Sequence, residues 1–150
     1  MQTSRTPTSE FDPHAAAVTG AVQQVAAAVW RIVAPNPSPL TGPVTNTYVV
    51  GTHGAVVIDP GCDDRAHLER VLEVAGGAVE RIVCTHSHPD HSPGAAWLRE
   101  RTGAPVCGLP PPDDGYQDPS YAPDAGIAEG ACIAAGAHVE PGTVVRAGWI

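Results

Sequence analysis

The chain has 150 residues, enough for one domain with a buried core. Sixteen acidic residues oppose eight basic ones, giving a net charge of -8, and all eight bases are arginine. The absence of lysine excludes mechanisms that need a Schiff-base or P-loop lysine, and the acidic balance disfavours a nucleic-acid partner. Because 43% of the residues are hydrophobic and 16% are charged, the composition favours a globular chain over a disordered one.

The cysteines and the N-terminus indicate the cellular compartment. The four cysteines are widely spaced and include no C-x-x-C pair, which is typical of reduced, buried thiols. No apolar segment follows the N-terminus as in a secretory signal, and no run approaches the roughly 18 apolar residues that span a bilayer. We therefore expect a cytoplasmic protein that does not associate with membranes.

The elements expected in chain order alternate between strands and helices. Residues 1–27 are expected to form a flexible or weakly helical N-terminal tail, and residues 28–150 a partial domain. Strand-forming residues bounded by turn signals predict strands at 29–33, 47–50, 55–58, 81–85 and 105–108. The Pro-, Asp- and Gly-rich stretch 109–123 is expected as a long loop, of a kind that is usually functional or disordered. The alternation predicts the α/β fold class.

Two helices are expected between the later strands. An aspartate, Asp63 or Asp64, caps the first helix, which stops at a pair of glycines. His67 falls on the polar side of this helix and is expected to be a surface or structural residue. Ser92 is expected to cap the second helix, with Pro93 at its first position.

A cluster of metal-binding residue types follows the strand expected at 81–85. Three histidines and one aspartate lie within six residues, in the order His86, His88, Asp90 and His91. Alternate residues at the exit of a strand point to the same side, so His86 and His88 can bind one ion. After a turn, Asp90 and His91 can face a second ion, and Asp90 is also the candidate catalytic residue that handles the proton. Imidazole with carboxylate suits zinc, with iron or manganese as alternatives, and a pair of ions activates water for hydrolysis.

The motif Thr-His-Ser-His-Pro-Asp-His at 85–91 resembles the signature of the metallo-β-lactamase-fold hydrolases. Residues 41–51 look like the early hairpin of that superfamily, and Val-Ile-Asp-Pro-Gly at 57–61 looks like its first motif. The early segment, together with Asn36 and Pro37, is similar to the branch that contains lactamase-β-like protein 2 and its bacterial relatives. The match covers roughly residues 28–108, in the order and spacing of the family.

The resemblance implies an αββα sandwich with one or two zinc ions at the edges of its sheets. By position, His86 and His88 match ligands of the first zinc. Asp90 and His91 match ligands of the second zinc, and Asp90 is placed near the attacking water. Asp59 matches a residue that supports the metal-binding loop.

The family pattern also includes later ligands that this sequence does not show. In the family, a later histidine completes the first zinc site, a later aspartate bridges the ions and a final histidine completes the second site. His138, in the stretch His-Val-Glu-Pro-Gly, is faintly similar to the first of these and is kept as a candidate ligand. The second half of the sandwich is largely missing, so we expect the N-terminal half of a longer enzyme.

Three functional hypotheses follow. The first is a zinc-dependent hydrolase that directs a metal-activated water at an ester, thioester, amide or phosphodiester bond of a small molecule. The second is a truncated, non-catalytic remnant that binds one metal weakly or none. The third is half of a split enzyme completed by a partner chain, and a homo-oligomer is the other assembly considered. The motif is shared across all these substrate classes and does not distinguish them.

Overall fold

Six strands form one mixed sheet, in the spatial order β1-β2-β3-β4-β5-β6. The computed structural model describes residues 18–39, 41, 44–128, 132–134 and 137–138. The strands of this sheet are β1 (Val22–Ala26), β2 (Val29–Val33), β3 (Asn46–Val50), β4 (Ala55–Ile58), β5 (Val79–Val83) and β6 (Val106–Cys107). The first four strands are antiparallel neighbours, whereas β5 pairs in parallel with both β4 and β6.

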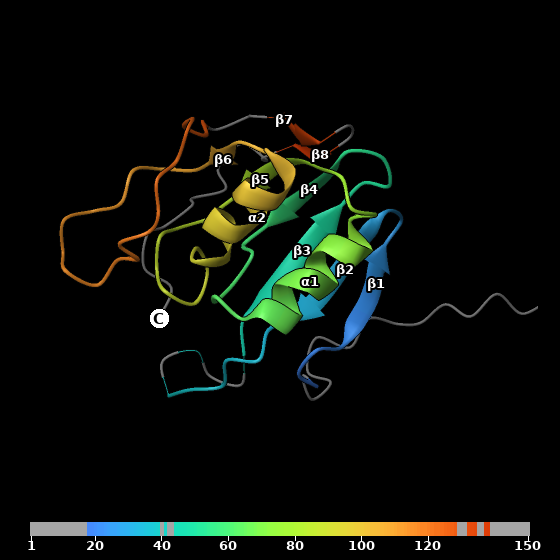
Figure 1. Ribbon diagram of the computed structural model, residues 1–150, viewed down its shortest axis with the longest axis horizontal. Helices are drawn as coiled ribbons and strands as arrows, with labels where there is room; N and C mark the ends of the chain where they lie inside the picture. The colour runs from blue at the N-terminus through green and yellow to red at the C-terminus, as the bar shows by residue number, and fades with distance from the viewer. Residues whose placement is uncertain (1–17, 40, 42–43, 129–131, 135–136, 139–150) are drawn as a thin grey trace, which may run out of the picture.

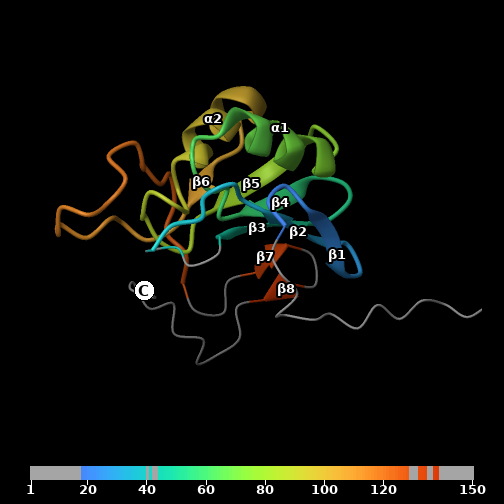
Figure 2. The ribbon, with the colours of Figure 1, turned by 90° about the horizontal axis from the view of Figure 1, so that it is seen from below.

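Two helices connect the parallel strands and cover one face of the sheet (Figure 1). α1 (Arg65–Val74) leads from β4 to β5, and α2 (Gly94–Thr102) leads from β5 to β6. Parallel neighbours need such crossovers, because the chain must return to the edge from which the first strand began. Figure 2 shows both helices on one side of the sheet and the hairpin of β7 (Cys132–Ala134) and β8 (Ala137–His138) on the other. The expected α/β class is confirmed.

The main core lies between the helices and the sheet. Leu68 and Val71 of α1 and Leu98 of α2 are fully buried against Val57 of β4 and Ile82 of β5. Removing side chains of this size from water stabilises the fold by about 1.5–3 kcal/mol each. The core therefore holds the two helices, and the loops that precede them, at fixed positions on the sheet.

The opposite face of the sheet carries a second, smaller apolar cluster. Val56, Val83 and Cys107 are buried there, with Ile58 and Ile127 packed against them. Because successive residues of a strand point to opposite faces, β4 and β5 contribute to both clusters. Strands that are apolar on both faces are typical of the parallel part of a sheet that is covered on both sides.

Several local predictions are confirmed. The strands expected at 29–33 and 55–58 are β2 and β4. The first helix begins after Asp64, whose side chain accepts a hydrogen bond of 2.8 Å from the backbone N–H of His67, as expected of an N-cap.

The expectation of weakly helical structure before residue 28 is wrong where the chain is described. Residues 22–26 form β1, an edge strand paired with β2 through contacts such as Val22 with Ile32. Ala28 turns the chain between the two strands with a φ of 56°. The alanine-rich composition favours a helix only weakly, and the backbone hydrogen bonds to β2 override it. In the described part of the chain, neither helix has the length or apolar composition needed to cross a bilayer.

Candidate metal centre

The candidate site lies at the edge of the sheet where the parallel strands β4 and β5 end. Asp59 follows β4 directly, and the segment 84–93, called the metal loop below, connects β5 to α2. Because the carboxyl ends of parallel strands meet at the same edge, these distant segments come together there. Backbone hydrogen bonds of 2.9 Å join them, from the Gly61 N–H to the His91 carbonyl and from the Gly94 N–H to the Gly61 carbonyl.

Three of the residues singled out from the sequence converge in this loop. His86, Asp90 and His91 each offer one side-chain atom that could bind a metal ion, and these three atoms lie within 4.8 Å of one another. The ring centroids of His86 and His91 are 4.0 Å apart, and His91 Nε2 lies 3.2 Å from Asp90 Oδ2. Two imidazoles and a carboxylate are ligands that zinc and related divalent ions accept.

The hydrogen bonds around His86 determine which ring nitrogen is free. The Thr85 hydroxyl donates its single hydrogen to Asp59 Oδ2 at 2.7 Å. The 2.9 Å contact between Thr85 Oγ1 and His86 Nδ1 therefore uses a hydrogen on the histidine. In the neutral ring, Nε2 then carries no hydrogen and has a free lone pair. This buried atom has no hydrogen-bond partner among the described residues. A buried, unpaired ring nitrogen fits a metal ligand.

A hydrogen bond also determines which ring nitrogen of His91 faces the other candidate ligands. Its Nδ1 lies 2.9 Å from Asp59 Oδ2 and donates to this carboxylate. In the neutral ring, Nε2 then carries a lone pair that faces the Asp90 carboxylate oxygen at 3.2 Å. Two acceptors at this distance repel unless a proton or a cation lies between them. A histidine whose second nitrogen donates to a carboxylate is the usual arrangement behind a metal-binding imidazole.

The electrostatics distinguish the two histidines. Burial lowers the pKa of His86 below its usual 6.5, and the neighbouring His91 charge adds to this shift. Burial also acts to lower the pKa of His91, but the hydrogen bond and charge of Asp59 and the charge of Asp90 outweigh it, so this pKa is raised. A proton on His91 and a metal ion are therefore alternative positive charges at this position.

Asp59 connects the end of β4 to the metal loop. Its carboxylate accepts hydrogen bonds from the Thr85 backbone N–H and hydroxyl, both at 2.7 Å, and from His91. Its φ of 49° lies in the left-handed region, which costs energy for a residue other than glycine and which aspartate tolerates better than most. This backbone conformation aims the carboxylate at the loop. The role of a supporting residue was predicted for Asp59 from the sequence.

Two other candidate ligands stand apart from this group. The ring of His88 lies edge-on to that of His86, with centroids 4.7 Å apart, but His88 is not part of the convergent trio. The His88 carbonyl accepts backbone hydrogen bonds from His91 and Ser92, which turn the chain toward α2. The backbone of His138 lies in β8, and its side chain is outside the described part of the structure.

The expected capping role of Ser92 is wrong. α2 begins at Gly94, Pro93 occupies the N-cap position, and no side chain in the described part of the chain caps this helix. The hydroxyl of Ser92 instead donates to the buried carboxylate of Asp118 at 2.7 Å. This charged acceptor comes from the long loop after β6, and its position relative to Ser92 could not be read from local sequence.

His67 is a structural residue, one of the two expected alternatives, but its expected place on the polar side of the helix is wrong. This side chain is only 5% exposed, because the first turn of α1 faces β3. Its Nε2 lies 2.9 Å from the hydroxyl of Thr47, and that hydroxyl donates to the Asp59 carbonyl at 2.7 Å. His67 and Thr47 thus lie behind the backbone of Asp59. Neither was singled out as part of the site.

Thr45 supports the metal loop from another direction. Its hydroxyl donates to the Asp90 carbonyl at 3.1 Å and accepts a hydrogen bond of 2.7 Å from Asn36 Nδ2. Asn36 Oδ1 also accepts from the Thr45 backbone N–H at 3.0 Å. The segment between β2 and β3 is therefore attached to Asp90 through a short chain of hydrogen bonds.

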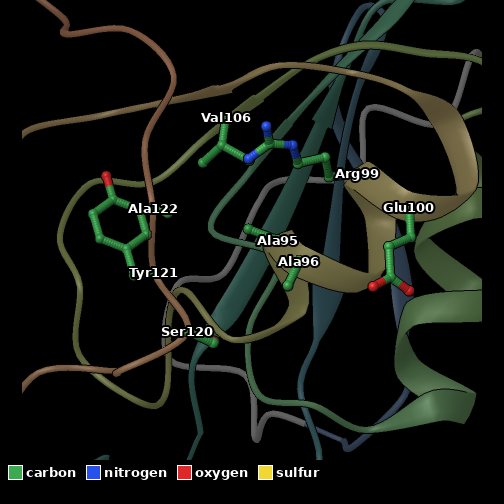
Figure 3. A pocket seen from close by; sticks show the side chains of 8 residues that line it. All are labelled: Ala95, Ala96, Arg99, Glu100, Val106, Ser120, Tyr121 and Ala122. Carbon is green, nitrogen blue, oxygen red and sulfur yellow. The ribbon is translucent and has the colours of Figure 1, made fainter.

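A surface pocket of about 420 Å³ lies beside the metal loop rather than in it. Figure 3 shows Ala95, Ala96 and Arg99 of α2 on one side of this pocket and Tyr121 on the other. Among the described side chains, none of the candidate ligands in the metal loop lines it. The pocket is therefore a separate feature from the trio of His86, Asp90 and His91.

Comparison with known proteins identifies the family. Residues 40–145 match the model of the metallo-beta-lactamase superfamily. The chain is 42% identical over 67 residues to a hydroxyacylglutathione hydrolase of Albidiferax ferrireducens, covering 43% of this chain and 26% of the relative. It is 37% identical over 83 residues to a beta-lactamase-like protein 2 homolog of Drosophila melanogaster, covering 52% of this chain and 28% of the relative. The chain thus spans about a quarter of the length of these curated relatives.

Solved structures show the same fold. A variant of a metallo-beta-lactamase from Cronobacter sakazakii superposes with a TM-score of 0.59 at 21% identity, covering 76% of this chain and 49% of that one. A beta-lactamase domain protein from Burkholderia ambifaria gives a TM-score of 0.52 at 27% identity, covering 63% of this chain and 32% of that one. The family match over most of the sequence and the shared fold lead to one conclusion: this chain belongs to the metallo-beta-lactamase superfamily.

Proposed function

We propose that this chain carries the metal-binding part of a zinc-dependent hydrolase. The observation that supports this proposal best is the buried Nε2 of His86, which has no hydrogen-bond partner among the described residues. His86 also belongs to the same group of possible metal ligands as Asp90 and His91. A divalent ion bound there supplies a Lewis acid that lowers the pKa of water and polarises the bond to be cleaved.

Each residue of the loop has a proposed role. His86 and His88 would hold a first ion, and Asp90 and His91 a second. Asp90 would also accept the proton of the attacking water, while Asp59 keeps the His91 ring in the ligating tautomer through its 2.9 Å hydrogen bond. His138 is a further candidate ligand, proposed from the sequence alone.

The proposed substrate is a small molecule with an ester, thioester, amide or phosphodiester bond, and we propose the thioester as the first to test. The Passalora fulva relative, 37% identical over 81 residues and covering 51% of this chain and 24% of its own length, is named an atrochrysone carboxyl ACP thioesterase. The net charge of -8 disfavours a nucleic-acid substrate. A reducing, cytoplasmic location is proposed because Cys62, Cys84 and Cys107 are free thiols.

Metal stoichiometry is the decisive measurement. We expect one to two zinc ions per chain by elemental mass spectrometry after gentle desalting, and loss of metal in the double variant His86→Ala, His88→Ala. His53→Ala is the matched control, because His53 is exposed on the β3–β4 turn. Unchanged metal content in the double variant would contradict the assignment.

Turnover separates the remaining hypotheses. Hydrolysis of chromogenic thioesters by the zinc-loaded chain, above the rate of free zinc, would support the enzyme, and Asp90→Asn should reduce this rate more than it reduces metal occupancy. Metal binding without turnover would favour the non-catalytic remnant. Turnover that appears only on addition of a second chain, or only in a homo-oligomer, would favour a site completed by a partner.

A further inference from the structure

The long loop between β6 and β7 places a buried carboxylate beside the metal loop. Asp118 is only 5% exposed. Its Oδ2 accepts the Ser92 hydroxyl at 2.7 Å, and its Oδ1 accepts the Ser120 N–H at 2.8 Å and the Ser120 hydroxyl at 2.6 Å. These donors are uncharged. No residue in the described part of the chain forms an ion pair with Asp118.

Asp118 contacts the metal loop on both sides of the candidate ligands. Its backbone N–H donates to the Ser87 carbonyl at 2.7 Å, and Ser87 lies between His86 and His88. Its side chain holds Ser92, which directly follows His91. One residue therefore bonds to the loop within the first pair of histidines and again just after the last histidine.

The neighbouring residue strengthens the first of these attachments. Gln117 Oε1 accepts the Ser87 hydroxyl. The amide of Gln117 is itself held, because its Nε2 donates to both carboxylate oxygens of Asp114 at 2.8 Å. Ser87 is thus bonded through its main chain to Asp118 and through its side chain to Gln117, and it is only 2% exposed.

A buried carboxylate without a cationic partner is costly, so a fold retains it where its hydrogen bonds are needed. The bonds from Ser120 are local, because Ser120 lies two residues further along the same loop. The bonds to Ser87 and Ser92 connect it to the metal loop between the first two histidines and directly after the last one. The charge also adds a fixed negative potential next to a site for a cation.

We propose that Asp118 is a positioning residue of the metal centre, which sets the spacing of the metal loop by bonding to Ser87 and Ser92. This inference rests on the proposed function, since it assigns Asp118 a role toward the ions that the histidines and Asp90 of the metal loop would bind. Asp118 acts through the loop and does not touch the ion or the substrate.

The test compares Asp118→Asn with Asp113→Asn in the full chain. Both variants remove one negative charge from the same loop, but Asp113 is exposed. Zinc affinity is measured by competition with a chromophoric chelator, ligand geometry by the visible spectrum of the cobalt-substituted protein, and folding by urea unfolding of the metal-free chain. We expect Asp118→Asn to weaken zinc binding about 10-fold or more and to change the cobalt spectrum. Asp113→Asn should do neither.

A second variant covers the case in which Asp118→Asn does not fold. Ser92→Ala removes one hydrogen bond to the carboxylate and leaves the charge, so it should shift the cobalt spectrum in the same direction by a smaller amount. Wild-type affinity and spectrum in Asp118→Asn, or in Ser92→Ala if the first variant is unfolded, would overturn the inference. Absence of metal binding by the wild-type chain would instead overturn the proposed function, so the two failures are distinguishable.

Discussion

Asp59 Oδ2 lies 2.9 Å from His91 Nδ1, so the residue that follows β4 orients a histidine 32 positions later in the chain. The same oxygen accepts the Thr85 hydroxyl, and the other oxygen accepts the Thr85 backbone N–H. Because Thr85 in turn contacts His86 Nδ1, one carboxylate influences the tautomers of both histidines of the trio. The geometry of the candidate site thus depends on the parallel pairing of β4 with β5.

Replacing Asp59 by asparagine should weaken zinc binding about 10- to 100-fold. The amide offers one acceptor and one donor in place of two acceptors, so either Thr85 or His91 faces an N–H group and loses its bond. Chelator competition measures the change. Asp63→Asn, at an exposed position in the turn before α1, is the control. Equal affinity in both variants would show that Asp59 does not support the ligands.

Replacing Thr45 by valine should lower the free energy of unfolding by about 1 kcal/mol, because the Asp90 carbonyl and Asn36 Nδ2 each lose a partner. Valine keeps the shape of threonine, so the change reports on the hydroxyl. Urea unfolding of the metal-free chain measures it, with Thr52→Val on the exposed β3–β4 turn as the control. A loss no larger than that of the control would mean that water replaces these bonds.

Replacing Gly94 by alanine should destabilise the chain by about 1–3 kcal/mol. A Cβ at Gly94 would lie 2.5 Å from Leu68 Cδ2 and 3.1 Å from the Pro60 carbonyl oxygen, so either the fully buried Leu68 side chain or α2 itself would have to shift. Thermal unfolding measures the effect. Gly126→Ala is the matched control, because a Cβ there meets no described atom within 4 Å. Wild-type stability in Gly94→Ala would contradict this close packing.

The buried His67 should make stability depend on pH. Burial lowers the pKa of His67 below its unfolded value of 6.5, so the unfolded chain binds this proton more readily than the folded chain. The free energy of unfolding therefore falls as pH decreases below 6.5, by at most about 1.4 kcal/mol for each pH unit from this one group. Urea unfolding of the metal-free chain at pH 7.5 and 5.5 measures the loss.

The variant His67→Gln isolates this contribution. Glutamine can still donate to Thr47 but binds no proton, so the loss of stability between the two pH values should be smaller in the variant than in the wild type. Groups such as His91 titrate in both proteins and cancel in the difference. An equal loss in both would show that His67 is accessible to protons in the folded state.

Local patterns were sufficient for part of the fold. The strands β2 and β4 and the Asp64 cap of α1 follow from runs of strand-forming residues and from a capping residue before an apolar helical face. They failed at β1, where a neighbouring strand rather than the composition selects the extended conformation. They failed again at Ser92, which resembles a cap but bonds to an acceptor 26 residues away.

The sequence by itself determined the α/β class, the family resemblance and the cluster of His86, His88, Asp90 and His91, because these are features of residue type and short-range spacing. Only the tertiary structure decided which nitrogen of His86 is free, that His67 is buried behind Asp59, and that Thr45 and Asp118 hold the metal loop. These contacts join residues 20 to 45 positions apart. They exist because the order of the strands and the packing of both helices bring those segments to one edge of the sheet. Local sequence periodicity does not specify such contacts between distant segments.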